Sequence, residues 1–338
     1  MNLKYVYTKR NFESEVFYDL VYEWEDDLAN ELKLSLYFEY SSAAIYEIWS
    51  HKFIRGLYRL FPFLCKWFFP SDNGLRFDML PHMGKRRANS EHMIPCVIDF
   101  YLQEEQLSQF NISNKHHPLM LISSMEAYNY LLEKKAYIKD LNIQHLALSI
   151  SDKYKIDSNT RFEKEYDLVL MGRQNPVLAD FFNEYVKTHP TIKYVYRKIE
   201  GGSFNYYLVQ NGKETSIGGI NKREQYMALM RKARIVFYST PDIDTDHERA
   251  HGFNQVTPRF LEWIACGAHV IARYMPNPDS EYYRLQDFSK PIETYEEFEK
   301  AMDYALTHEV DMAKYSEYLS HHYTSVRANE LRRIINNL

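Results

Sequence analysis

Cysteine is scarce in this chain and badly placed for cross-linking. Only three cysteines occur among 338 residues, at Cys65, Cys96 and Cys266. Their odd number and wide separation argue against a disulfide framework and match no metal-ligand spacing. We therefore expect a protein of a reducing compartment, the cytoplasm.

Long apolar runs and an excess of basic charge are also missing. We find no stretch of about eighteen uncharged apolar residues, the length that a membrane-spanning helix needs. The first residues, MNLKYVYTKRNFESE, carry charges where a signal peptide needs an apolar core. We thus expect neither secretion nor a membrane span. The net charge of −5 argues against nucleic acid as the main partner.

The composition is otherwise that of a folded protein, with 45% hydrophobic and 26% charged residues. The length allows two domains, each with its own core. A polar stretch over Ser149–Arg161 is the expected linker. We predict a first domain over 1–150, a second over 151–312, and a C-terminal helical segment over 313–338 that packs back on the first.

The second half alternates strands with helices. The apolar runs predict strands over Tyr166–Met171, Ile192–Tyr196 and Ala233–Tyr238, with helices over Pro176–Thr188 and Lys222–Lys232 between them. This alternation is typical of a parallel, doubly wound α/β sheet.

The first half is less regular. Short apolar runs suited to buried strands occur in it, and helix candidates stand between or after them. These runs are Arg76–Leu80, Ile94–Phe100, Leu119–Ile122 and His145–Ile150.

The most informative segment is GFNQVTPRFLEWIACGAHVI, residues 252–271. Thr257 is the predicted N-cap of a helix with Pro258 at its first position, so its free backbone N–H groups would attract an anion. Glu262, one turn further, could reach the ribose of a bound nucleotide. Gly267 would end the helix before a short apolar strand. The alternative is an ordinary helix–turn–strand unit in which Glu262 is solvated.

A second candidate for nucleotide binding is Gly172-Arg173, which follows the first strand of the second half. Glycine lets the backbone approach a phosphate, and arginine can bind it through two hydrogen bonds. The alternative is a surface arginine after a tight turn.

The order TPRFLEWIACGA, starting at Thr257, resembles the signature of group 1 glycosyltransferases, in particular the spore-maturation-like branch. In that family this helix holds the sugar-nucleotide donor. The resemblance implies that Thr257, Pro258 and Arg259 contact the diphosphate and that Glu262 contacts the ribose. Members also carry a Gly-Arg like Gly172-Arg173 at the start of the donor domain.

The resemblance covers residues 165–275 and departs from the family at one position. Asn254 stands where many members have a second glutamate, eight residues before Glu262. The usual contact to the transferred sugar is therefore not carried over. The family implies the GT-B fold, in which two Rossmann-like domains face each other across a cleft.

The catalytic base of such an enzyme usually comes from the acceptor domain. His82 directly follows the strand Arg76–Leu80, and an imidazole is suited to accepting a hydroxyl proton. Asp99 is a carboxylate within the apolar run Ile94–Phe100, where a buried charge needs a reason. Each residue has a structural alternative to a catalytic role.

The acidic run from Asp242 to Asp246 invites a metal-binding interpretation, which we reject. A calcium loop would need glycine where His247 stands and glutamate where Phe253 stands. We expect a solvated loop, no metal and no cofactor beyond the donor substrate.

Basic and aromatic residues interleave from Trp49 to Phe69 without an acidic residue. Lys52, Arg55 and Arg59 share one face of a helix, which suits peripheral binding to an anionic membrane. The alternative is a helix packed on the domain core.

Together these features predict a cytoplasmic, metal-independent glycosyltransferase of the hexosyltransferase type. It would move a sugar from a nucleotide-diphosphate sugar to a glycan or lipid-linked glycan in bacterial surface polysaccharide synthesis, at the inner face of the membrane. The alternatives are a sugar-nucleotide epimerase of the same fold and a non-catalytic, membrane-associated protein that only binds the nucleotide sugar.

Overall fold

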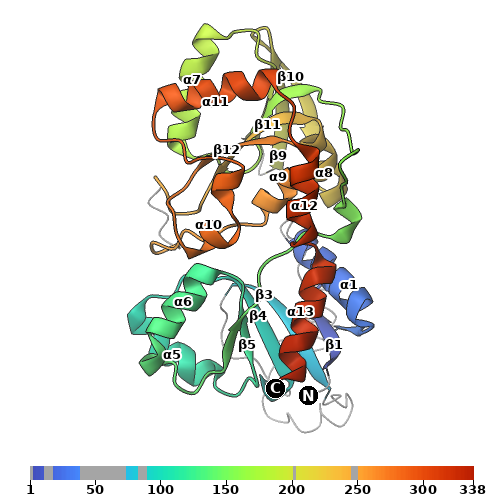
Figure 1. The fold of residues 1–338 in the computed structure, drawn as a ribbon, viewed down its shortest axis with the longest axis vertical. Coiled ribbons are helices and arrows are strands. Elements are labelled where there is room, and N and C mark those ends of the chain that lie inside the picture. Colours follow the sequence, from blue (N-terminus) through green and yellow to red (C-terminus); the bar gives the residue numbers. More distant parts are fainter. Residues whose placement is uncertain (1–2, 11–17, 39–73, 83–89, 201–202, 245–249) are drawn as a thin grey trace, which may run out of the picture.

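Two six-stranded sheets organise the chain, one in each lobe of the molecule (Figure 1). The computed structural model describes residues 3–10, 18–38, 74–82, 90–200, 203–244 and 250–338. The segment Trp49–Phe69 lies outside these residues. None of the described helices is both long and apolar enough to cross a membrane.

The sheet of the first lobe is parallel throughout, in the order β2-β1-β3-β4-β5-β6. A fully parallel sheet needs cover on both faces, and its central strands β3, β4 and β5 are accordingly buried along most of their length. The strands are β1 (Leu3–Thr8), β2 (Ser35–Phe38), β3 (Leu75–His82), β4 (Met93–Asp99), β5 (Met120–Ile122) and β6 (Ile143–His145).

Helix α1 (Tyr18–Leu32) covers this sheet because its apolar residues recur at helical spacing. Val21, Trp24 and Leu28 are buried in one cluster with strand residues. The last helix of the chain, α13 (Thr324–Asn336), lies beside α1 in the same lobe (Figure 1). The other helices that the structure describes in this lobe are α5 (Glu104–Asn114) and α6 (Met125–Glu133).

The second sheet is mixed, in the order β10-β9-β8-β7-β11-β12. Strands β8, β7, β11 and β12 are parallel, and β9 and β10 add an antiparallel hairpin at one edge. The strands are β7 (Tyr166–Val169), β8 (Tyr194–Glu200), β9 (Ser203–Gln210), β10 (Lys213–Gly219), β11 (Ala233–Ser239) and β12 (His269–Arg273). The doubly wound prediction is confirmed for the parallel part.

The helices of the second lobe are α7 (Pro176–Thr188), α8 (Arg223–Arg231), α9 (Arg259–Ala265), α10 (Pro278–Tyr282), α11 (Tyr295–Thr307) and α12 (Met312–Ser320). Short 3-10 turns span Ser90–His92, Lys135–Tyr137, Asp152–Tyr154 and Leu285–Asp287. The predicted bounds of α7 are correct. The helix starts at Pro176 because the side chain of Asn175 accepts a hydrogen bond from the Leu178 N–H and because proline fits the first turn.

The strand expected over His145–Ile150 is wrong beyond its first residue. Strand β6 ends at His145, and the chain then runs irregularly through the junction of the lobes. There the Leu148 N–H donates to the hydroxyl of Tyr283, 2.9 Å away, and Ile150 bridges to Tyr323. The apolar pattern reflects burial at this junction.

The strand order of the second sheet reverses between β7 and β11. Ligands of open α/β sheets bind at such a switch point, beyond the carboxyl ends of the strands. Gly172 and Arg173 follow β7 there, and Thr240 follows β11. The predicted nucleotide site therefore stands where this fold class binds ligands.

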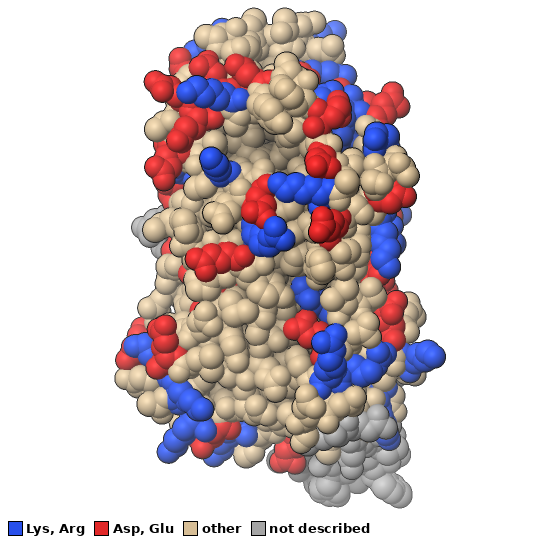
Figure 2. Space-filling model, viewed as in Figure 1, with Lys and Arg blue, Asp and Glu red and all other residues tan. Residues whose placement is uncertain are grey.

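Charged side chains of both signs are interspersed over the face drawn in Figure 2. No field of one sign extends across that face.

Candidate functional site

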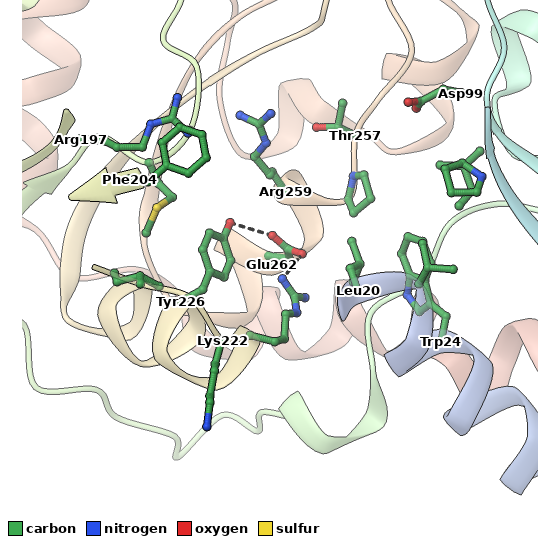
Figure 3. A pocket seen from close by; sticks show the side chains of 18 of the residues that line it. Leu20, Trp24, Asp99, Arg197, Phe204, Lys222, Tyr226, Thr257, Arg259 and Glu262 are labelled. Atoms are coloured by element: carbon green, nitrogen blue, oxygen red, sulfur yellow. Dashed lines mark hydrogen bonds and ion pairs between the residues drawn. The ribbon is translucent and has the colours of Figure 1, made fainter. Parts of the chain in front are cut away.

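A cavity of about 670 Å³ opens between the two lobes (Figure 3). This volume lies in the range of ligand pockets, about 300–1,000 Å³. Leu20, Trp24 and Asp99 line it from the first lobe, and Arg259 and Glu262 face them from the second. The cavity therefore combines an apolar wall on α1 with charged groups on α9 and at the end of β4.

Gly172 gives the Arg259 side chain its place beside the end of β7. The backbone φ at Gly172 is +75°, and a Cβ atom there would lie 2.8 Å from Nη1 of Arg259. A residue with a side chain would be strained and would displace the guanidinium. We predicted that Gly172 lets a phosphate approach the backbone; in the structure it is the guanidinium of Arg259 that lies against this glycine.

Arg197 and Arg259 line this part of the cavity, and Arg173 lies near Arg259 but is not one of the lining residues. Arg173 follows Gly172, and Arg197 on β8 lies with its guanidinium carbon 4.2 Å from the ring centre of Phe204. Partial removal from water, followed by the positive charge of Arg259, lowers the pKa of Arg173. Burial also lowers the pKa of Arg197, and Arg259 adds to the effect.

Within the described ranges, no carboxylate lies within ion-pair distance of Arg173, Arg197 or Arg259. Cations gathered without counter-charges repel one another, and a bound anion relieves the repulsion. The geometry suits a diphosphate, whose oxygens can accept from several guanidinium groups at once.

Glu262 is buried, so the alternative of a solvated helix carboxylate is wrong. Its Oε1 lies 2.6 Å from Nη1 of Arg223, and its Oε2 accepts a hydrogen bond of 2.8 Å from the hydroxyl of Tyr226 (Figure 3). Burial and then the charge of Glu262 raise the pKa of Tyr226 well above its ordinary value. Tyr226 therefore stays a hydrogen-bond donor to the carboxylate.

The pair of Glu262 and Arg223 continues into the first lobe. Nη2 of Arg223 lies 3.6 Å from Oε1 of Glu23 on α1, and the side chains of both are nearly buried. The Tyr154 hydroxyl donates to Glu23 at 2.9 Å, and Lys153 forms an ion pair with it. Burial lowers the pKa of Arg223, but the two carboxylates outweigh it and raise that pKa. The sequence analysis missed Glu23, Arg223 and Tyr226.

Thr257 is not the N-cap of α9, and that prediction is wrong by one residue. The cap is Pro258, whose helical φ and ψ of −54° and −27° place it already in the turn. The Thr257 N–H donates to the Tyr238 hydroxyl at 3.0 Å, so it is not free for an anion. The Phe260 N–H donates to the Thr257 carbonyl at 3.2 Å. Thr257 and Pro258 nevertheless line the cavity.

The two candidate bases stand next to each other at the carboxyl end of the first sheet. His82 on β3 and Asp99 on β4 are register partners. Asp99 is half-buried and lines the cavity, as does Pro81. The structure describes the backbone of His82 only. Strand ends thus bring Asp99 to the wall opposite the arginines.

The acidic run after β11 is not a simple solvated loop. Asp244 forms an ion pair with Arg273 and accepts a hydrogen bond of 3.0 Å from Asn175. Asp242 accepts the Gly252 N–H at 2.6 Å. These contacts fix the loop, while Asp246 lies outside the described residues. Where the structure is described, no group of three His, Cys, Asp or Glu side chains has the arrangement of metal ligands.

Asn254, at the position of the second family glutamate, shapes the same loop. Its Oδ1 accepts from the Thr240 hydroxyl at 2.8 Å and from the Asp242 N–H at 3.3 Å. An amide that closes the loop in this way replaces the carboxylate expected from the family.

Residues 180–333 match the family model described as glycosyl transferase-like. This segment is a glycosyl transferase-like domain. It contains the Arg197, Arg223, Arg259 and Glu262 side chains of the cavity. No curated protein is similar enough in sequence to match the chain.

Two of the matching solved structures illustrate the shared fold. HepE of Anabaena, in complex with UDP and glucose, is 10% identical with a TM-score of 0.52, and the match covers 100% of each chain. The UDP-forming α,α-trehalose-phosphate synthase of Burkholderia xenovorans, in complex with glucose-6-phosphate, is 9% identical with a TM-score of 0.50 and covers 95% of this chain and 85% of its own. At these identities the similarity concerns the fold alone, and it confirms the predicted GT-B architecture.

Proposed function

We propose that the protein is a glycosyltransferase that uses a nucleotide-diphosphate sugar as donor. The observation that carries the proposal is the set of arginines without counter-charges, placed at the switch point of a glycosyl transferase-like domain. In this proposal residues 151–312 bind the donor and residues 1–150 bind the acceptor.

In the reaction the acceptor hydroxyl attacks the anomeric carbon of the donor sugar. The bond from that carbon to the diphosphate oxygen breaks, and the nucleoside diphosphate leaves with the electron pair. Arg173 and Arg259 stabilise the negative charge that develops on this leaving group. Their positive charges support a reaction without a divalent metal.

Glu262 binds the ribose hydroxyls of the donor. Each of its oxygens has one partner, Arg223 or Tyr226, and a carboxylate oxygen can accept a second hydrogen bond. The two partners fix the direction of the remaining lone pairs. Arg223 also compensates a carboxylate that would otherwise repel an anionic donor.

Asp99 is the proposed base that accepts the acceptor proton. It lines the cavity on the wall opposite Arg259 (Figure 3). His82, its register partner, is the other candidate. Replacing Asp99 by asparagine should abolish transfer while nucleotide binding persists, whereas loss of activity in His82→Gln alone would assign the base to His82.

The proposed acceptor is a glycan or a lipid-linked glycan of a bacterial surface polysaccharide, reached from the cytoplasmic face of the membrane. The basic and aromatic composition of Trp49–Phe69 supports this location. Co-sedimentation with anionic liposomes tests it, with a variant in which Lys52, Arg55 and Arg59 are changed to Glu as comparison. Wild type that ignores anionic vesicles at low salt would remove this support.

Calorimetry with UDP, ADP and GDP tests the donor site. Losing a charge-assisted contact should weaken binding by about 1.5–3 kcal/mol, roughly ten- to a hundredfold, in Arg259→Ala. Arg161→Ala is the matched control, since Arg161 is exposed and donates only to local carbonyls at Ser158 and Thr160. Equal affinity in both variants would sink the assignment. Sugar interconversion without transfer would identify an epimerase instead, and binding without donor turnover would identify a sensor.

A further inference from the structure

The loop that leads to the donor helix belongs to the second lobe by sequence but is anchored in the first. We name residues 250–258 the donor loop, because Arg259 follows them directly. Phe253 is buried among first-lobe residues, 8% exposed. Its ring meets those of Phe100 and Tyr130 edge to face, with centroids 5.8 and 5.3 Å apart. An aromatic side chain of the donor loop thus fills the core of the opposite lobe.

Hydrogen bonds from the first lobe hold the loop backbone on both sides of Phe253. Gln103 donates its side-chain amide to the His251 carbonyl at 2.8 Å. Oε2 of Glu126, in the first turn of α6, accepts the Asn254 N–H at 2.8 Å. These hydrogen bonds fix the backbone path of the donor loop, in addition to holding the loop against the first lobe.

A single buried carboxylate then joins the loop to α6. Asp279 at the start of α10 is fully buried. Its Oδ1 accepts the Met125 N–H at the start of α6 at 2.5 Å, and its Oδ2 accepts the Val256 N–H at 2.9 Å. Helices α10 and α6 face each other across the junction in Figure 1. Separating the lobes would break both the aromatic packing and this carboxylate bridge.

We propose that Phe253, Glu126 and Asp279 are positioning residues through which the first lobe sets the donor loop, so that nucleotide affinity depends on contact between the lobes. This inference rests on the proposed donor site. The contacts order the loop before the donor arrives, and an ordered loop spares the donor the entropy cost of fixing Thr257, Pro258 and Arg259. If these contacts between the first lobe and the donor loop are weakened, nucleotide binding must itself supply the free energy that orders the loop. The fraction of molecules competent to bind then falls.

The first test compares Phe253→Leu with Phe182→Leu. Phe182 is an equally buried phenylalanine of the second lobe and meets Tyr194 and Phe237 edge to face at 5.0 and 5.7 Å. Both changes remove aromatic packing, but only the first touches the anchor. We expect UDP, ADP or GDP, whichever binds wild type, to bind about tenfold more weakly to Phe253→Leu, about 1.4 kcal/mol. Phe182→Leu should keep wild-type affinity.

Hydrogen exchange provides a second readout that needs no ligand. Amides of residues 250–258 should exchange faster in Phe253→Leu than in wild type and Phe182→Leu, because the donor loop detaches locally. Unchanged protection of the loop would overturn the inference even if the wild type binds no nucleotide. Nucleotide binding by wild type with equal affinity in both variants would overturn it while leaving the donor site standing.

Asp279→Asn tests the carboxylate bridge, with Asp311→Asn as its control. Asp311 also accepts a helix N-terminal N–H, from Lys314 at 3.0 Å, but in α12 and without contact to the loop. An asparagine at position 279 keeps one acceptor oxygen and turns an amide group toward the other N–H. We expect the KM for the donor to rise severalfold in Asp279→Asn alone. A fall in kcat alone would contradict positioning of the donor loop.

Discussion

The ion pair between Glu262 and Arg223 allows stability and donor binding to be separated by mutation. Glu262→Gln keeps the shape of the side chain and removes the charge. Among the described residues, Arg223 then keeps one ion-pair partner, Glu23, 3.6 Å away. The side chain of Arg223 is 10% exposed. Removing one partner of a buried pair costs about 3–5 kcal/mol. Because Glu23 still compensates part of the charge, we expect the free energy of unfolding to fall by about 3 kcal/mol, the lower end of that range.

The double variant Glu262→Gln/Arg223→Met should recover much of this stability. It removes both buried charges, so neither is left without a partner, and Glu23 keeps Lys153 and Tyr154. Affinity for the nucleoside diphosphate should not recover, because the carboxylate that we propose contacts the ribose is still missing. Urea denaturation of the wild type, both single variants and the double variant gives the coupling free energy of the pair.

Two results would refute the reasoning. If the loss of unfolding free energy in the double variant equals the sum of the losses in the two single variants, the pair contributes no coupling free energy. Recovery of nucleotide affinity together with stability would mean that Glu262 acts only as a structural partner of Arg223, and the ribose would then need another contact.

Three further predictions concern pH, backbone and metal. Burial raises the pKa of Glu25 to about 8 and that of Glu126 to about 7. In the unfolded chain both carboxyl groups lose their protons near pH 4.5, so the folded state holds protons that the unfolded state has released. The stability that these groups contribute is therefore lost as pH rises from 5 to 8. Glu25→Gln should flatten that slope in urea titrations at pH 5.5 and 8.5, and an unchanged slope would contradict it. Gly172→Ala should weaken nucleotide binding at least threefold, roughly 0.7 kcal/mol, by displacing Arg259, as calorimetry would show. Sugar transfer should persist in excess chelator, and activity restored only by magnesium or manganese would refute a metal-independent reaction.

Local signals in the sequence were enough for much of the second lobe and for part of the site. Asn175 and Pro176 mark the start of α7, and glycine at 172 marks a left-handed turn beside β7. Because parallel strands end at one edge of a sheet, residues after β7 and β11 meet there. Gly172, Arg259 and Glu262 could therefore be assigned to one site before any coordinates were known.

The rest of the site depends on long-range packing that no local pattern encodes. Glu23 belongs to a helix that the sequence analysis did not identify, and Arg197 lies on β8 beside a hairpin whose outer strand, β10, is exposed throughout. One signal was available: Arg223 and Tyr226 are three positions apart in a predicted helix and so share a face. A basic and a hydroxyl-bearing residue on one face could have suggested a partner carboxylate.

The position of α13 has a consequence for how the protein is made. Its Ala328, Leu331 and Ile335 complete the same apolar cluster as Trp24 and Leu28 of α1. Because synthesis proceeds from the amino terminus, α1 emerges from the ribosome some three hundred residues before its partner helix. The strands of the first sheet can pack against its apolar face earlier, but the cluster is complete only when α13 has been made. The core of the first lobe is thus completed only after the second lobe has been synthesised, and a chain that stops before α13 would expose the part of the cluster that this helix covers.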